Sequence, residues 1–325
     1  MSSSCSINYA EWGVETYEKR IAPVIQSSFK EISPDINSGA WLNTCNPGPL
    51  STNRYRLFPG SLFLLWVEAL QPDADKTGSE FAAAAIELLH NASLIHDDIL
   101  DNHVIRKGQP TLLSMYGSSI GLLGGDGLFA AAISMLAQLP ASKINGVLNR
   151  LGNAVENVVF GQILDESEQW ARVSSNMQFD HWLKVCKGKL SLGNVAGTLA
   201  AFWVGKGSME KDIEMLLDDF SVVSQIINDF GDLFNFSGYH AIAPSLRMTA
   251  EESLRKPTLP LIWSKCNNAS KININALHSL VQKAHDEINH RKDIAIQRLA
   301  LLPITKDERI NTILSSFFNT PSMPI

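Results

Sequence analysis

The stretch EFAAAAIELLHNASLIHDDILDNHVIRKGQPT, residues 80–111, decides the fold class of this chain. It is apolar on most sides of a helix and ends in Asp97, Asp98 and Asp101, with Arg106 and Lys107 just beyond. A helix that is hydrophobic all round belongs in the centre of a protein rather than at its surface. The stretch therefore predicts a central helix that delivers carboxylates to one place.

The rest of the chain repeats this helical spacing, and strand-like alternation is nearly absent. We expect an all-α protein, a single-domain helical bundle of residues 1–325 around a central cavity. Helices are expected near residues 8–32, 58–71, 79–102, 112–117, 120–138, 143–170, 177–204, 210–236, 250–266, 273–299 and 306–318.

Composition and charge exclude several classes of protein. The formal net charge of −6 argues against a nucleic-acid binder, because contacts to a phosphate backbone require a basic face. The cysteines, Cys5, Cys45, Cys186 and Cys266, lack the spacing of a disulfide framework or a zinc site. We expect a cytoplasmic protein without a signal peptide or a stable membrane span, because the first residues lack a basic, apolar segment and the most apolar stretches are short.

The aspartates at the end of the quoted helix indicate a metal site. Asp97 and Asp101 lie one turn apart on the same helix face, and Asp98 follows Asp97 on the adjacent face. The helix macrodipole is negative at this end and disfavours anions by roughly 0.3–1 kcal/mol each, so a positive charge should compensate. Mg²⁺ fits, because it takes oxygen ligands from one or two carboxylates and from substrate phosphates. The alternative is a solvated acidic helix end.

A second acidic stretch strengthens this interpretation. VSQIINDFGDLFN, residues 223–235, places Asp229 and Asp232 on one face of another apolar helix, beside Gln225 and Asn228. Two such helix ends in one bundle can face each other across a cavity. A diphosphate bridging metal ions would then account for isolated cations in apolar surroundings, namely Arg54, Arg56, Arg106, Lys107, Lys187 and Lys256. Each of these cations alone would be interpreted as a surface charge.

Together the motifs resemble those of the trans-isoprenyl diphosphate synthases, the polyprenyl synthetase family. The first acidic stretch is similar to the family's first aspartate-rich region, and SQIINDFGDLFN to the second. LRKPTLPLIW is similar to its GKxTLP segment, with weaker likenesses in NRYRLFPG, in LLGGDGLFAAA and at Lys187. The resemblance runs in order from about Arg54 to Pro260.

The resemblance implies an isoprenoid synthase fold, a homodimer, and metal-dependent ionisation of an allylic prenyl diphosphate. Asp97 and Asp101 would hold two Mg²⁺ ions with support from Asp98, and the second region would hold a third; Mn²⁺ is the alternative ion. The ligands implied in the second region are Asn228, Asp229 and Asp232. The residues implied to bind the allylic diphosphate are Arg106, Lys187, Gln225 and Lys256. The pocket implied for isopentenyl diphosphate comprises Asn53, Arg56, His90 and Lys107.

Several of these positions depart from the family pattern. Asn53 stands where the family has a lysine, and Lys107 stands where it has an arginine. Losing one positive charge beside a diphosphate costs on the order of 2 kcal/mol or more, so isopentenyl binding should be weakened. Asn228 replaces an aspartate, Gly188 a threonine and Ser224 a phenylalanine.

These departures leave three functions open. The preferred one is chain elongation, prenyl transfer to isopentenyl diphosphate that gives a longer diphosphate of the farnesyl or geranylgeranyl class. The second is a terpene synthase that cyclises or rearranges a finished prenyl diphosphate. A weakened isopentenyl pocket fits this function, because the nucleophile is then a double bond of the substrate and carries no diphosphate. The third is prenyl transfer to another acceptor, such as a peptide tryptophan or an aromatic ring, or a non-catalytic partner subunit. The intact first motif argues against a non-catalytic subunit.

Other residues have less specific interpretations. Ala92 and Ser93, one turn before the first aspartate, are small and favour a long product, although helix packing explains them equally well. Larger side chains nearby could still narrow the pocket, namely Ile86, Leu89, Leu128 and Phe129. We expect Asp218 and Asp219 to lie on a solvated helix face, and His96 to be packed or hydrogen-bonded rather than bound to metal.

Overall fold

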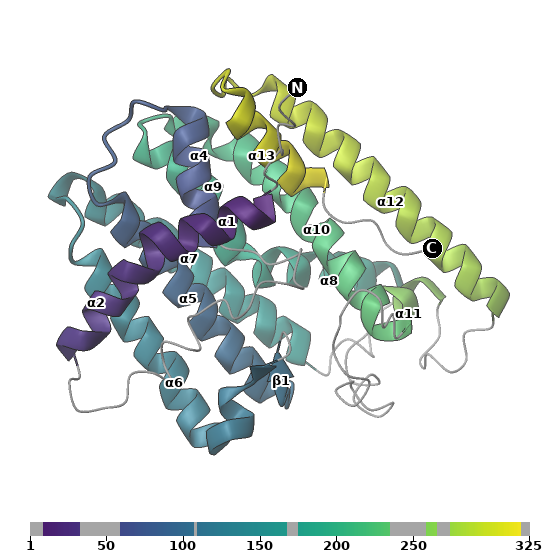
Figure 1. Ribbon diagram of the computed structural model, residues 1–325. Helices are drawn as coiled ribbons and strands as arrows, with labels where there is room; N and C mark the ends of the chain where they lie inside the picture. Colours follow the sequence, from purple (N-terminus) through teal and green to yellow (C-terminus); the bar gives the residue numbers. More distant parts are fainter. Residues whose placement is uncertain are drawn as a thin grey trace, which may run out of the picture. The chain divides into compact units, whose positions relative to one another are not determined.

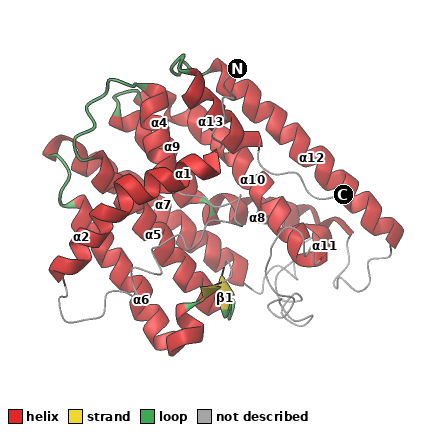
Figure 2. Ribbon diagram, in the orientation of Figure 1, coloured by secondary structure: helices red, strands yellow, loops and turns green. Residues whose placement is uncertain are grey.

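The computed structural model describes residues 9–32, 59–106, 109–167, 175–234, 258–264 and 274–319. In these ranges the chain is helical apart from turns and one pair of two-residue strands, β1 (Ile105–Arg106) and β2 (Gln109–Pro110) (Figure 2). The all-α fold class is confirmed. The strand pair was not anticipated, since nothing in its sequence alternates.

Most helices follow the expected ranges closely (Figure 1), but of the helix expected over 250–266 the structure shows only residues 259–264 as helical, since residues 250–257 and 265–266 lie outside the described residues. A predicted helix over 177–204 is instead two helices that meet at Leu190, and the predicted break near residue 117 is a single non-helical residue, Gly117, at φ 81° and ψ 171°. The elements are α1 (Tyr9–Thr16), a π-helix η1 (Tyr17–Ile21), α2 (Ala22–Ile32), α4 (Pro59–Leu70), α5 (Ser79–Leu100), α6 (Leu112–Leu136), α7 (Ala141–Glu166), α8 (Ser175–Lys189), α9 (Ser191–Trp203), a short 3₁₀ helix η4 (Gly207–Met209), α10 (Glu210–Phe234), α11 (Leu259–Ser264), α12 (Ile274–Leu301) and α13 (Glu308–Asn319).

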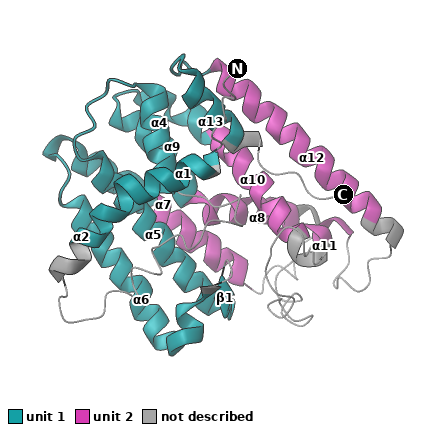
Figure 3. Ribbon diagram, viewed as in Figure 1, with its two compact units in different colours: residues 1–153, 192–214, 302–320 teal, residues 154–191, 215–301, 321–325 magenta. Residues whose placement is uncertain are grey.

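The chain divides into two compact units (Figure 3). Unit 1 comprises residues 1–153, 192–214 and 302–320, and unit 2 comprises residues 154–191, 215–301 and 321–325. The expectation of a single domain over residues 1–325 stays a prediction.

The core of unit 1 is built on α4 and α5. Every residue of α4 except Glu68 is buried, and α5 is buried along most of its length. The alanines at 82–85 let neighbouring helices approach α5 closely, and α5 packs most extensively against α6. The helix that ends in the first aspartates is therefore central in its unit, as its all-round apolar character predicts.

The core of unit 2 joins α8, α10, α11 and α12 through side chains that include Trp182, Ile226, Phe230, Leu259 and Ile288. Ion pairs surround this core where we expected a solvated face. The Lys187 Nζ lies 2.6 Å from Asp218 Oδ2. Arg291 and Arg298 both pair with Asp219, whose side chain is 13% exposed. The expectation for Asp218 and Asp219 was wrong, because basic side chains of α8 and α12 that are distant in sequence neutralise them.

Among the helices that the structure describes, α6 has the length and apolar character needed to cross a membrane, and 44% of its most apolar window is buried in the protein. The central helix of a globular protein has the same character, so this alone does not indicate a membrane protein.

Candidate active site

The carboxylates of the first motif are positioned by the way in which α5 ends. The Asn102 residue has a φ of 52°, a left-handed conformation that asparagine adopts more readily than most residues. The His103 amide donates to the Asp98 carbonyl at 2.9 Å, and the Asn102 amide to the Ile99 carbonyl at 3.4 Å. These bonds form a Schellman motif, which satisfies the last carbonyls of the helix and turns the chain back across its end.

The strand pair β1–β2 then returns Arg106 to the same carboxylates. The Arg106 guanidinium donates from Nη2 to Asp97 Oδ2 at 2.8 Å and from Nε to Asp98 Oδ1 at 2.7 Å. Thr111 anchors the far side of this turn, since its hydroxyl donates to the His103 carbonyl at 2.7 Å and accepts from the Ser114 amide at the start of α6. The structure thus confirms that Arg106 lies beside the first motif, although its predicted contact with a diphosphate stays a prediction.

The donor set at this helix end fits a divalent metal ion. Asp97, Asp101 and His103 each offer a ligand atom, and these atoms lie within 4.8 Å of one another. Two carboxylates and one imidazole are ordinary ligands of divalent cations. His103 was not predicted as a ligand. The signal was available, because an asparagine after the last aspartate indicates a left-handed helix end that brings the next residue back.

The charges in this cluster shift one another's proton affinities. The Asp98 carboxylate, 3.7 Å from the ring, raises the pKa of His103 above its usual value against the opposing effect of burial, and the charge of Asp101 adds to the rise. Burial lowers the pKa of Arg106, but the charges of Asp97 and Asp98 outweigh it and the net shift is upward. Arg106 is therefore a permanent cation at the end of α5.

The second motif lies on α10 in unit 2. The Asp229 side chain is 5% exposed and accepts three hydrogen bonds, from the Trp182 indole at 2.8 Å, the Leu259 amide at 2.8 Å and Gln225 Nε2 at 2.6 Å. This carboxylate therefore joins α8, α10 and α11. Trp182 was not identified as a partner, because nothing in the local sequence connects it to a residue 47 positions away.

The neighbours of Asp229 have different surroundings. Asn228 is exposed on α10. Asp232 belongs to the same helix, but its side chain lies outside the described residues. Lys187, whose side chain is 52% exposed, pairs with Asp218 about three turns before Asp229 on α10. Their assignments as metal and diphosphate ligands stay predictions, as does that of Asp229.

Gly188, which stands where the family has a threonine, lies at a close contact between α7 and α8. A Cβ at this position would lie 2.8 Å from the Asn157 carbonyl oxygen and 2.8 Å from the Gly161 Cα. Real Cβ atoms do not approach backbone so closely, so the glycine lets the two helix backbones pack together. The departure from the family pattern at this position thus has a packing reason.

The remaining predicted residues are divided between α5 and undescribed segments. His90 is half-buried, Ala92 is fully buried, and the Ser93 hydroxyl donates to the His90 carbonyl at 2.7 Å. His96 Nε2 lies 3.3 Å from the Leu122 carbonyl oxygen and its ring stacks on Phe129, so its expected packed role is confirmed. Five predicted residues lie outside the described residues, namely Asn53, Arg54, Arg56, Lys107 and Lys256.

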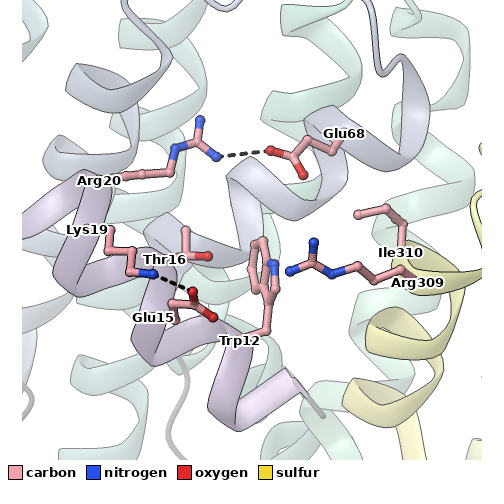
Figure 4. Close-up of a pocket in the computed structure, with 8 residues that line it drawn as sticks. All are labelled: Trp12, Glu15, Thr16, Lys19, Arg20, Glu68, Arg309 and Ile310. Atoms are coloured by element: carbon pink, nitrogen blue, oxygen red, sulfur yellow. Dashed lines mark hydrogen bonds and ion pairs between the residues drawn. The ribbon is translucent and has the colours of Figure 1, made fainter. Parts of the chain in front are cut away.

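A cavity of about 230 Å³ in unit 1 contains none of the predicted site residues (Figure 4). Its lining includes the Trp12 ring, Arg309 and the ion pair between Arg20 and Glu68 (Figure 4). It therefore has no part in the site considered above.

Carboxylates at the end of a central helix, with an arginine returned onto two of them, suit a magnesium ion, which proteins bind through one or two carboxylates and substrate phosphates. The sequence model of the polyprenyl synthetase family matches residues 56–294, well over half of the chain. The chain belongs to this family of prenyltransferase enzymes, so the predicted membership is confirmed.

Curated relatives include a geranylgeranyl diphosphate synthase from Cyanophora paradoxa, 28% identical over 67% of this chain and 72% of that protein. A (2E,6E)-farnesyl diphosphate synthase from Mycobacterium tuberculosis is 25% identical over 64% of this chain and 56% of that protein. A short chain isoprenyl diphosphate synthase from Methanocaldococcus jannaschii is 35% identical over 40% of this chain and 37% of that protein. The similarity thus spans only part of these relatives.

Solved structures show the same fold over nearly the whole chain. A geranylgeranyl pyrophosphate synthetase from Pyrococcus horikoshii has a TM-score of 0.70 at 22% identity, covering 95% of this chain and 98% of that one. A polyprenyl synthase from Caulobacter crescentus, complexed with calcium and isoprenyl diphosphate, has a TM-score of 0.68 at 18% identity, covering 96% of this chain and 97% of that one. The isoprenoid synthase fold is thereby confirmed.

Proposed function

We propose that this protein ionises an allylic prenyl diphosphate in the presence of Mg²⁺ and transfers the prenyl group to isopentenyl diphosphate, which gives a longer trans-prenyl diphosphate. The observation that carries the proposal is the cluster of Asp97, Asp98, Asp101 and Arg106 at the end of α5. The curated relatives support it, since they are named as prenyl diphosphate synthases. The farnesyl or geranylgeranyl class is the expected product.

The described residues supply the means for the first step. Asp97 and Asp101 would hold the divalent ions, which neutralise the charge of the diphosphate when bound. Arg106 is a permanent cation with donors in a planar fork, the geometry that suits a phosphate oxygen pair. Asp98, which is 5% exposed, holds Arg106 in place. In this proposal the apolar helices around α5 exclude water from the allylic cation.

Apart from Asp229, the second motif has the same role in the proposal as in the family resemblance. Gln225 and Lys187, with Lys256, bind the allylic diphosphate, and Asn228 and Asp232 supply further oxygen ligands for metal. The buried bonds of Asp229 support a different contribution from this residue, because they fix α10 against α8 and α11.

A terpene synthase on the same scaffold is the second candidate. Asn228 at the first position of the second motif favours it, because an amide is a weaker metal ligand than a carboxylate and alters how the departing diphosphate is held. Prenyl transfer to a non-isoprenoid acceptor would also begin with the same ionisation, so the reaction products must distinguish these functions.

The deciding experiment incubates the full chain with Mg²⁺ and geranyl, farnesyl or geranylgeranyl diphosphate, each with and without isopentenyl diphosphate. Longer diphosphates that require isopentenyl diphosphate would support chain elongation. Hydrocarbons or alcohols formed without it would replace that function with a terpene synthase. Asp101→Asn should abolish turnover, whereas Asp212→Asn, at an exposed carboxylate in the first turn of α10, is the matched control and should not.

We also infer a homodimer formed through α6. Leu123 and Ile133 on this helix are 60% and 65% exposed, and Tyr116 and Leu122 are 52% exposed each. Exposed apolar residues in this number mark a contact surface. Leu123→Asp should convert the dimer to a monomer in light scattering, and an unchanged mass for both Leu123→Asp and Ile133→Asp would contradict the inference. A cytoplasmic location accompanies this proposal as an expectation.

A further inference from the structure

We propose that His103 is a nitrogen ligand of the metal ion held by Asp97 and Asp101, and that it makes this site prefer Mn²⁺ or Co²⁺ to Mg²⁺. The inference rests on the proposed function, since it concerns the same site. Its first support is geometric: the ligand atoms of these three residues lie within 4.8 Å of one another, close enough for one ion to contact all three.

The backbone holds His103 at this place. The Schellman motif at the end of α5 fixes its amide on the Asp98 carbonyl at 2.9 Å. On the other side, its carbonyl accepts from the Thr111 hydroxyl at 2.7 Å. A residue bonded through both its amide and its carbonyl has little freedom to leave, so its imidazole is presented to the carboxylates by the fold.

The orientation of the ring also suits a ligand. Its Nδ1 lies 3.7 Å from Asp98 Oδ1, and Asp98 is buried. Metal-binding histidines commonly direct one ring nitrogen toward a carboxylate, which orients the ring and leaves the other nitrogen for the ion. In this arrangement Asp98 serves as the orienting carboxylate, Nε2 as the ligand atom, and Asp97 and Asp101 as the oxygen ligands.

The alternative is a protonated His103 that only neutralises Asp98. That role is already filled, because the Arg106 guanidinium lies 2.7 Å from Asp98 Oδ1 and bonds Asp97 as well. Arg106 bonds one oxygen of each carboxylate in these contacts, and a carboxylate accepts through both of its oxygens. A metal ion bound by Asp97, Asp101 and His103 would therefore add a second positive charge beside carboxylates that Arg106 already contacts.

A nitrogen ligand changes which ion the site prefers. Mg²⁺ takes oxygen ligands and retains its water molecules, whereas imidazole is a good ligand for the later divalent ions. Replacing His103 with glutamine should therefore weaken Mn²⁺ or Co²⁺ binding by about tenfold or more, and Mg²⁺ binding by less than about threefold.

The test uses the full chain without substrate, so that it does not depend on turnover. Calorimetry measures the binding of Mn²⁺, Co²⁺ and Mg²⁺, and pulsed electron paramagnetic resonance of the Mn²⁺-loaded protein detects nitrogen bound directly to the ion. The variants are His103→Gln, His103→Ser and a matched control, His96→Gln, whose histidine contacts the Leu122 carbonyl instead. Nitrogen coupling in the wild type and in His96→Gln, absent from both His103 variants, is the expected result.

Two outcomes would overturn the inference, and they differ in what they say about the proposed function. Mn²⁺ that binds in an Asp101-dependent way without nitrogen coupling would remove His103 from the site and leave the carboxylate site intact. Failure of every ion to bind, in the presence or absence of inorganic pyrophosphate, would remove both the nitrogen ligand and the metal-dependent function.

Discussion

The two neighbouring residues of the second motif, Asn228 and Asp229, should respond to mutation in opposite ways. Asp229 is 5% exposed and accepts three hydrogen bonds, whereas Asn228 is exposed on the same helix. Asp229→Ala leaves two buried donors, the Trp182 indole and the Leu259 amide, without this acceptor. Each stranded donor costs about 1–3 kcal/mol, so the free energy of unfolding should fall by about 2–6 kcal/mol.

A loss of this size should lower the midpoint of thermal unfolding by roughly 10 °C, because 1 kcal/mol corresponds to about 2–4 °C in a domain of this size. Circular dichroism measures the midpoint. Asp229→Asn keeps one acceptor oxygen and should lie between the wild type and the alanine variant. Asn228→Ala removes an exposed side chain and should change the free energy of unfolding by less than about 0.5 kcal/mol, while it lowers turnover with Mg²⁺.

An Asp229→Ala protein that unfolds within about 2 °C of the wild type would show that the buried hydrogen bonds of Asp229 do not stabilise the fold. If such a stable variant were also inactive, Asp229 would be a metal ligand, as the sequence resemblance implies.

The other predictions concern packing, capping and acid stability. Gly188→Thr should lower the free energy of unfolding by about 1–3 kcal/mol, because the new side chain would meet the α7 backbone. Gly152→Thr, where a Cβ meets nothing within 4 Å, is the control and should not lower it; urea unfolding measures both variants. Thr111→Ala should lower the free energy of unfolding by about 1 kcal/mol, because it removes the side-chain cap at the start of α6. Thr111→Ser keeps a capping hydroxyl and should keep this stability; equal losses in the two variants would contradict the capping role. Burial raises the pKa of Glu80, but the hydrogen bond and the charge of Arg20 lower it by more, so that the pKa lies below its usual 4.5. This lowered pKa stabilises the fold above about pH 4.5, and the contribution is lost as the pH falls through the folded-state pKa; Arg20→Gln should remove this part of the acid dependence, and an unchanged pH profile of unfolding would contradict it.

Much of the fold was accessible from the sequence because helical periodicity is a local signal. The boundaries of α4, α5 and α12 follow from the apolar spacing and lie within two residues of the expected ranges. The split between α8 and α9 at Leu190 was missed, since the apolar pattern continues across it. The β1–β2 pair was missed because two-residue strands carry no periodicity.

The surroundings of individual charges were less accessible. Asp218 and Asp219 looked like a solvated face, yet the partners that neutralise them come from residues 187, 291 and 298. Gly188 looked like an eroded catalytic position, and the contact with α7 gives it a packing role. Such pairings depend on which helices are neighbours, and local sequence does not contain this information.

Local sequence was enough to establish that this protein is all-helical, that an apolar helix ends in Asp97, Asp98 and Asp101, and that its motifs belong to the polyprenyl synthetase family. Residue types and their spacing carry these properties. The three-dimensional arrangement was needed to establish that His103 has a ligand atom within 4.8 Å of those of Asp97 and Asp101, and that Asp229 is buried against Trp182 and Leu259. The reason is physical: a ligand set or a buried hydrogen bond depends on distances between atoms, and those distances are fixed when a helix ends in a particular turn and packs against particular neighbours.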